Sequence, residues 1–219
     1  MDLDKARRNM VNQQIRPWGV SDASTLELLS HIRREDFAPT LWRNLAFADM
    51  TLPLGEKPHQ IMLEPKMEAR FLEALAIKPT DKVLEIGAGS GYMAALLAAK
   101  AEYVVSVEID ANLAGQAREN LRRADVNNAM VEIADGSAGF IDRAPYDAIV
   151  ISGGVPEIPP VILRQLRSGG RLVAVVGQPP TLRAQYVRVL EGQNHQTEVL
   201  FETCLPYLEN FSTMPAFLF

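Results

Sequence analysis

A short apolar segment, residues 83–86, leads directly into three glycines spaced two apart, Gly87, Gly89 and Gly91. The segment is β-branched and brief enough for a buried parallel strand. Because glycine lacks a Cβ, a backbone of this kind can turn sharply and lie close against a ligand. The Ala- and Leu-rich residues 91–100 follow and favour a helix. A strand, a glycine turn and a helix in this order predict a nucleotide-type site.

The glycine spacing separates two classes of cofactor. A dinucleotide fingerprint requires G-x-G-x-x-G, and the position of its third glycine is Tyr92 here. With Glu85 in front, the pattern Glu-x-Gly-x-Gly-x-Gly instead resembles that of methyltransferases that use S-adenosylmethionine (SAM). We therefore expect SAM as cofactor and S-adenosyl-L-homocysteine as product. The residues of this segment that we expect at the cofactor are Glu85, Gly87, Ala88, Gly89, Ser90, Gly91 and Tyr92.

Acidic residues at the ends of the next two expected strands support a nucleoside cofactor. The second expected strand ends on Glu108, with Ile109 next to it, and the third ends at Asp135-Gly136. Ligands of open α/β sheets lie beyond the carboxyl ends of the strands. We expect Glu108 to hold the two ribose hydroxyls, and Asp135 to accept a hydrogen bond from the adenine amine. Ile109 and Gly136 complete the expected cofactor site.

Strand-like and helix-like segments alternate along most of the chain. This alternation predicts an α/β fold with a doubly wound, mostly parallel, seven-stranded Rossmann-like sheet, whose last two strands are antiparallel. Residues 1–65 are expected to form a helical and irregular cap over the acceptor site, and residues 66–219 the SAM-binding domain. The expected strands are 82–86, 103–107, 129–134, 146–151, 171–176, 184–190 and 197–205, and the expected helices are 66–76, 91–100, 112–123 and 160–166.

The N-terminal region also has helical character. Residues 4–35 are expected to form two helices, separated at Pro17-Trp18-Gly19. Asp4 is the expected cap of the first helix, and Ser21 or Asp22 that of the second. Solvated helix faces are the expected place of the basic residues Arg7, Arg8, Arg16, Arg33 and Arg34.

Composition limits the classes of partner and site. A chain of 219 residues with 47% hydrophobic residues fits one domain with an elaboration. A net charge of −5 provides no general attraction for nucleic acid. The single cysteine, Cys204, excludes an internal disulfide and a cysteine-rich zinc site; we expect it in the core and expect no metal. Without a signal peptide or an apolar run of membrane-spanning length, we expect a cytoplasmic protein that does not bind membranes. The sequence leaves the oligomeric state open.

Further motifs resemble the protein-L-isoaspartate (D-aspartate) O-methyltransferase family, over about residues 7–178. Residues 33–39, Arg-Arg-Glu-Asp-Phe-Ala-Pro, are similar to the family's Pro-Arg-Glu-x-Phe-Val-Pro, and residues 46–49 to its Ala-Tyr-x-Asp. Residues 144–149 and 165–173 also match. The resemblance implies SAM-dependent methyl transfer to a protein, peptide or small carboxylate acceptor, with Asp49 as the catalytic polar group on the acceptor side.

The chain departs from the family just before the helix expected at 66–76. The family carries Thr-Ile-Ser-Gln-Pro, whereas residues 61–65 here are Ile-Met-Leu-Glu-Pro. Leu63 stands at the family's Ser position and is not catalytic itself, because aliphatic side chains donate no hydrogen bond. Leu63 and Glu64 are expected to shape the acceptor pocket. The family's Val-Pro-Val-Gly also lacks its proline at residues 173–177.

Three functions agree with these features. No histidine stands at an expected strand end, and only His59, in an irregular stretch, is a candidate base. A carboxylate acceptor needs none, because it is ionised at pH 7. The first function is therefore a carboxyl O-methyltransferase of the isoaspartate type. The second is a methyltransferase of the same fold with another, small and apolar acceptor. The third is a SAM- or S-adenosylhomocysteine-binding protein without catalysis.

Overall fold

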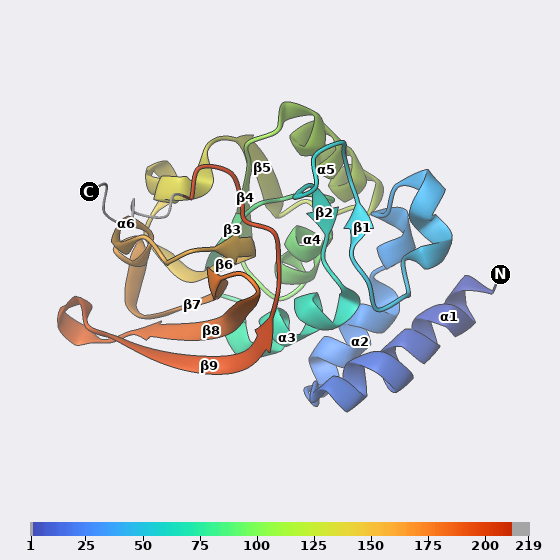
Figure 1. Ribbon diagram of the computed structural model, residues 1–219, viewed down its shortest axis with the longest axis horizontal. Helices are drawn as coiled ribbons and strands as arrows, with labels where there is room; N and C mark the ends of the chain where they lie inside the picture. Colours follow the sequence, from blue (N-terminus) through green and yellow to red (C-terminus); the bar gives the residue numbers. More distant parts are fainter. Residues whose placement is uncertain (1, 212–219) are drawn as a thin grey trace.

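A seven-stranded sheet lies at the centre of the computed structural model, which describes residues 2–211 (Figure 1). The strand order is β5-β4-β3-β6-β7-β8-β9. The first five strands in this order are parallel, and β8 and β9 pair antiparallel at one edge. The strands are β3 (Lys82–Ile86), β4 (Tyr103–Glu108), β5 (Ala129–Ile133), β6 (Tyr146–Val155), β7 (Leu166–Gln178), β8 (Thr181–Val189) and β9 (His195–Thr203).

Helices precede the sheet and connect its strands. The α-helices are α1 (Leu3–Met10), α2 (Ala23–His31), α3 (Pro65–Leu75), α4 (Tyr92–Ala98), α5 (Ala111–Arg123) and α6 (Pro160–Leu163). A π-helical turn, η1 (Val11–Ile15), continues α1. The 3₁₀ turns are η2 (Arg16–Trp18), η3 (Arg34–Asp36), η4 (Thr40–Leu45), η5 (Gly136–Ala138), η6 (Ile141–Arg143) and η7 (Glu191–Gln193). A small hairpin, β1 (Leu52–Pro53) and β2 (Ile61–Met62), lies between the N-terminal helices and α3.

The direction of strand order reverses between β3 and β6. Moving outward from β3, the chain proceeds through β4 and β5 on one side and through β6 and β7 on the other. In open α/β sheets, ligands bind outside the carboxyl ends of the strands at such a switch point. The topology therefore places the ligand site where β3 runs into the glycine segment.

The two faces of the sheet have separate hydrophobic clusters because side chains alternate along each strand. Val83 of β3 belongs to the cluster that also contains α3, α4, α5 and the N-terminal helices. Leu84 and Ile86 belong to the cluster on the other face, with Ile162 of α6. Glu85, between Leu84 and Ile86, consequently points toward the same face of the sheet as Val83, which α3, α4 and α5 cover.

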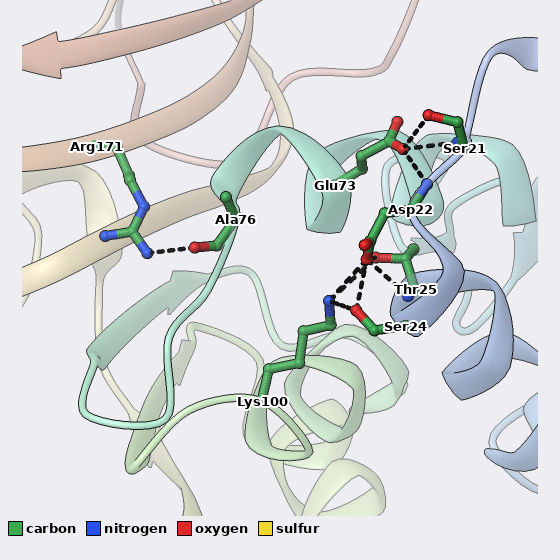
Figure 2. A network of polar contacts seen from close by, with 8 residues as sticks. All are labelled: Ser21, Asp22, Ser24, Thr25, Glu73, Ala76, Lys100 and Arg171. Carbon is green, nitrogen blue, oxygen red and sulfur yellow. Dashed lines mark hydrogen bonds and ion pairs between the residues drawn. The ribbon is translucent and has the colours of Figure 1, made fainter.

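A polar network attaches the N-terminal helices to the rest of the protein (Figure 2). The Asp22 carboxylate accepts hydrogen bonds from the Thr25 amide at 2.8 Å and from the Lys100 ammonium, at the end of α4, at 3.1 Å. The Glu73 carboxylate of α3 accepts from the amides of Ser21 and Asp22. Three helices are thereby joined around the start of α2.

The sequence predictions of the fold class and element order are confirmed. Asp22 caps α2 as expected, but the cap of α1 is Asp2, whose carboxylate accepts from the Lys5 amide. Asp4 lies inside α1 and pairs with Arg7. The prediction that Asp4 caps this helix was wrong. Asp2 and Asp4 both stand near the helix start, and the sequence alone does not separate the two.

Three further expectations were wrong. Arg7 and Arg34 are buried rather than solvated, because each pairs with a buried carboxylate from a distant segment. Cys204 is exposed, just beyond the end of β9. β6 continues to Val155, since Gly154 and Val155 pair with β7 after a register shift.

Within residues 2–211, no helix has the length and apolarity needed to cross a lipid bilayer.

The segment after β9 turns back across the carboxyl ends of the strands (red in Figure 1). The Gly154 amide donates to the Pro206 carbonyl at 2.9 Å, and the Leu208 amide donates to the Gly154 carbonyl at 3.0 Å. The side chain of Asn210 donates to Asp135 at 2.8 Å. We call residues 204–211 the return segment.

We expect Asp22→Ala to lower the free energy of unfolding by about 1–2 kcal/mol at pH 7, the effect of losing an N-cap. Hydrogen bonds from Ser24 and Thr25 hold the pKa of Asp22 far below its usual range. The contribution is therefore present at neutral pH and declines as the solution is acidified. Urea denaturation at pH 7 and pH 3 measures it.

Asp2→Ala provides a matched control, because Asp2 caps α1 through a single amide, that of Lys5. The loss from Asp2→Ala should be smaller than that from Asp22→Ala. Equal losses would contradict the account that the Asp22 network attaches the N-terminal helices to α3 and α4.

Candidate functional site

The glycine segment forms one wall of a pocket at the carboxyl end of β3. Gly87 and Gly89 line the pocket with φ values of 91° and 51°, which L side chains rarely adopt. A methyl group added at Gly89 would lie 3.1 Å from Leu54 Cδ1 and 3.7 Å from the Ile61 carbonyl oxygen. The β1–β2 hairpin therefore lies directly against the glycines, and their lack of side chains keeps the pocket open.

The Glu108 carboxylate, at the end of β4, fixes the glycine segment. Its Oε2 accepts from the Gly89 amide at 2.9 Å, and its Oε1 accepts from the Asp110 amide at 3.1 Å. The amides of Gly87 and Ala88 donate to the Val107 carbonyl. Only 7% of Glu108 is exposed, and the exposed part lies in the pocket. The ends of β3 and β4 are thus tied together around one acid.

Asp135, at the end of β5, faces the same pocket. Its Oδ1 accepts from the Ser137 amide at 2.9 Å, and its Oδ2 accepts from Asn210 of the return segment at 2.8 Å. Burial alone would raise the pKa of Asp135, but the hydrogen bonds from Ser137 and Asn210 lower it overall. Asp135 is therefore an ionised hydrogen-bond acceptor at neutral pH.

The structure brings six of the expected cofactor residues together in this pocket, and the other five lie outside its lining. Glu85, Ala88, Ser90 and Tyr92 are buried, and Gly91 packs against Ala117 of α5. The six that line the pocket are Gly87, Gly89, Glu108, Ile109, Asp135 and Gly136.

Glu85 is a buried carboxyl group one layer below the pocket. It accepts a hydrogen bond from Ser106 Oγ at 2.5 Å and one from Ser152 Oγ at 3.2 Å. Ser152 itself lines the pocket. Burial raises the pKa of Glu85 to about 8, although both hydroxyls lower it. The carboxyl group is consequently coupled to the pocket surface through the Ser152 hydroxyl.

The acceptor-side residues lie outside the pocket lining. Asp49 pairs with Lys66 at 2.9 Å, and the Asp49 side chain is 32% exposed. Leu63 is buried, and its carbonyl accepts a hydrogen bond from the Arg34 guanidinium. Glu64 is half-buried, and burial raises its pKa. Of residues 61–64, Ile61 alone lines the pocket.

Several pocket residues were not expected from the sequence. Ser152 is an exception, because it follows the fourth expected strand and the rule that sites lie at strand ends predicts it there. The others come from the β1–β2 hairpin and the return segment. No sequence pattern in these two parts indicates that they lie at a pocket. Glu209 connects these two parts by accepting from His59 at 2.8 Å and Lys57 at 2.6 Å. The unexpected members of these two parts are Leu54, Gln60, Ile61, Leu208, Glu209 and Phe211, whereas His59 was considered only as a candidate base.

The arrangement suits a neutral or cationic nucleoside rather than a metal or a phosphate. Four acidic residues, Glu108, Asp110, Asp135 and Glu209, line the pocket, and a carboxylate accepts hydrogen bonds from hydroxyl and amino groups. Among residues 2–211, no three His, Cys, Asp or Glu side chains gather closely enough to hold a metal ion.

Solved structures with this fold include two that cover most of the chain. A protein-L-isoaspartate O-methyltransferase superposes with a TM-score of 0.78 at 26% identity, over 91% of this chain and 64% of that chain. A candidate enzyme of the same name from Plasmodium falciparum, in complex with S-adenosyl-L-homocysteine, gives a TM-score of 0.75 over 91% of this chain and 96% of that chain. At 17% identity, this superposition shows a common fold and no more.

Sequence comparisons extend over nearly the whole chain. The family model for protein-L-isoaspartate(D-aspartate) O-methyltransferase matches residues 5–207. A protein-L-isoaspartate O-methyltransferase from Koribacter versatilis is 39% identical over 216 residues, which are 98% of this chain and 95% of that protein. A second, from Methanoculleus marisnigri, is 46% identical over 180 residues, or 81% of each chain. This chain therefore belongs to the protein-L-isoaspartate(D-aspartate) O-methyltransferase family.

Proposed function

We propose that this protein is a SAM-dependent O-methyltransferase of the protein-L-isoaspartate O-methyltransferase type, which methylates a carboxylate of a protein, a peptide or a small molecule. Family membership supports this function. The observation that carries it is the Glu108 carboxylate, which binds the Gly89 amide at the switch point of the sheet and faces the pocket. This is the place and the residue type that a ribose diol requires.

The hydrogen-bond acceptors of the pocket fit the nucleoside part of SAM. A carboxylate has about four lone-pair positions, and backbone or side-chain donors take one on each oxygen of Glu108 and Asp135. Each acid thus retains acceptor capacity toward the pocket. In this proposal Glu108 holds the ribose and Asp135 the adenine amine, and the glycine segment lies along the cofactor.

The reaction requires alignment more than acid–base chemistry. SAM supplies a methyl group bound to a positively charged sulfur. The acceptor carboxylate forms a bond to that methyl carbon while the carbon–sulfur bond breaks and its electron pair goes to sulfur. A methyl ester and S-adenosylhomocysteine result. No proton moves, so the protein has to hold an already ionised carboxylate about 3 Å from the methyl group.

Acceptor choice depends on residues 61–64 and the cap of residues 1–65. Ile61 and Leu54 give the pocket wall beside Gly89 an aliphatic surface. Asp49 remains the proposed acceptor-side polar group, and its partner Lys66 supplies a positive charge for an acceptor carboxylate. The aliphatic wall favours a second candidate function, in which the acceptor carries an apolar group beside its carboxylate.

Transfer of radioactive methyl from SAM separates the possible functions. An isoaspartyl peptide and a panel of small carboxylic acids with apolar substituents serve as acceptors. Labelling of any of them supports the proposed function and identifies the preferred acceptor class. SAM binding without labelling of any acceptor would instead indicate a binding protein without catalysis.

We expect the native chain to label an isoaspartyl peptide slowly, and Ile61→Thr to increase the rate. Thr returns a hydroxyl to the pocket wall, and one hydrogen-bond donor at a reacting centre contributes about 10²–10³-fold in rate. Ile61→Val is the matched control, because it also removes a methyl group but adds no hydroxyl. Fast labelling by the native chain, or equal effects of Thr and Val, would contradict this interpretation.

We expect Glu108→Ala to weaken SAM binding by about 1–3 kcal/mol, the range of a charge-assisted hydrogen bond. Calorimetric titration of the purified protein with SAM measures the change. Glu102→Ala, at the opposite end of β4, removes an exposed carboxylate and should leave the affinity unchanged. Unchanged affinity of Glu108→Ala would remove Glu108 from the cofactor site.

Glu85 produces a pH dependence of stability. Its pKa of about 8 in the folded protein exceeds the ordinary value of 4.5, so the folded state binds more protons between these values. The free energy of unfolding should therefore fall as pH rises through this window, by at most about 1.4 kcal/mol per pH unit from this group.

Glu85→Gln should make this fall shallower, because an amide does not ionise. Urea denaturation at pH 5, 6, 7 and 8 of the native chain and of Glu85→Gln measures the two slopes. Glu102→Gln, at an exposed site, should follow the native chain. Parallel slopes for the native chain and Glu85→Gln would show that Glu85 is already ionised throughout the window.

A further inference from the structure

Arg34 is fully buried, with 0% of its surface exposed, although it lies in a 3₁₀ turn near the N-terminus. A buried guanidinium is costly unless its hydrogen bonds and its charge are matched. Nothing in the proposed methyl transfer requires it to touch the cofactor or the acceptor. Its position in the core therefore needs a separate explanation.

The guanidinium of Arg34 joins its own turn to two other segments, one at Ala46 and one around the start of α3. Its Nε donates to the Ala46 carbonyl at 2.9 Å, its Nη1 to the Glu68 carboxylate of α3, and its Nη2 to the Leu63 carbonyl. The donors of a guanidinium lie in one rigid plane. The three acceptors are therefore held in a fixed mutual arrangement.

Charge and packing keep the Arg34 side chain in place. Glu68 is 3% exposed and forms an ion pair with Arg34. Burial raises the pKa of Glu68 to about 7, and Arg34 opposes that rise. The guanidinium carbon lies 5.0 Å from the centre of the Tyr92 ring, within the range of cation–π attraction. Tyr92, expected at the cofactor, thus supports Arg34 instead of lining the pocket.

The Leu63 carbonyl belongs to the segment that shapes the acceptor side. Ile61, two residues earlier, lines the pocket, and its carbonyl lies beside Gly89. Glu64, at the start of α3, makes no side-chain cap. Ile61 and Met62 pair with β1, and the Glu64 carbonyl accepts from the first turns of α3. Between these two regular elements, the Leu63 carbonyl is held by the bond from Arg34.

We propose that Arg34 is a positioning residue of the acceptor site: by holding the Leu63 carbonyl, its guanidinium sets the distance of Ile61 from the glycine segment. The inference rests on the proposed methyl transfer for its kinetic consequence. It assigns to Arg34 a role in acceptor alignment and not in cofactor binding, because Glu108 and Asp135 lie on other elements.

The test compares Arg34→Lys with Glu68→Gln. Lysine keeps the positive charge beside Glu68, but its single ammonium cannot reproduce the planar fork to Ala46 and Leu63. Arg34→Lys should lower kcat/KM for the acceptor about 10- to 100-fold, since small misplacements near a reacting centre have effects of this size. SAM affinity should stay within about twofold. Glu68→Gln retains the Arg34–Leu63 bond and should keep kcat/KM within about threefold of the native value.

A second variant separates loss of acceptor alignment from loss of folding. Arg34→Met combined with Glu68→Leu removes both buried charges, and such replacements are often neutral or stabilising. This double variant should fold, bind SAM and show the same loss of acceptor kcat/KM as Arg34→Lys. Native kcat/KM in the folded double variant, or equal losses in Arg34→Lys and Glu68→Gln, would overturn the proposal.

Amide hydrogen exchange of residues 61–64 gives a readout that does not depend on turnover. Exchange there should be about tenfold or more faster in Arg34→Lys and unchanged in Glu68→Gln, with the glycine segment protected in both. Absence of methyl transfer in the native chain, with this exchange pattern present, would remove the proposed function and leave the anchoring role intact. Unchanged exchange in Arg34→Lys would overturn the role of Arg34.

Discussion

The hydrogen bond from the Gly89 amide to the Glu108 carboxylate connects the ends of two neighbouring parallel strands at the switch point of the sheet. Because Gly89 has a positive φ and no side chain, the backbone can turn there while the β1–β2 hairpin lies against it. The same acid presents its remaining acceptor positions to the pocket. Glu108 thus fixes the glycine segment and, in the proposed function, also binds the ribose hydroxyls of the cofactor.

Residues 1–65 contain buried charged groups, one pair within the region and one pair that joins it to α3. Arg7 pairs with Glu35, and Arg34 pairs with Glu68. Isolated buried charges of this kind are strongly unfavourable, so each pair is stable only when both partners are in place. This requirement gives the cap one arrangement over α3 and α4. In the proposed function this region carries the acceptor side of the pocket, so electrostatic matching as well as packing would define that side.

The mostly parallel sheet and two of the pocket acids, Glu108 and Asp135, are readable from the sequence because parallel strands have apolar runs and end at a common edge. The buried arginines are not, since a guanidinium enters the core only when distant acceptors surround it. Gly153 and Gly154 resemble a loop, yet Gly154 lies in β6, where a methyl group would meet the Leu205 carbonyl at 2.7 Å. That contact depends on the return segment, and no sequence pattern near Gly154 predicts where the return segment lies.

We propose that the carboxyl ends of β3, β4 and β5 form a SAM site beside an acceptor segment anchored by Arg34. A crystal structure of the protein with S-adenosylhomocysteine tests it most directly. We expect the ribose hydroxyls on Glu108, the adenine amine on Asp135, and the sulfur between the glycine segment and Ile61. A cofactor bound elsewhere, or bound here with its ribose away from Glu108 and its sulfur away from Ile61, would contradict the claim.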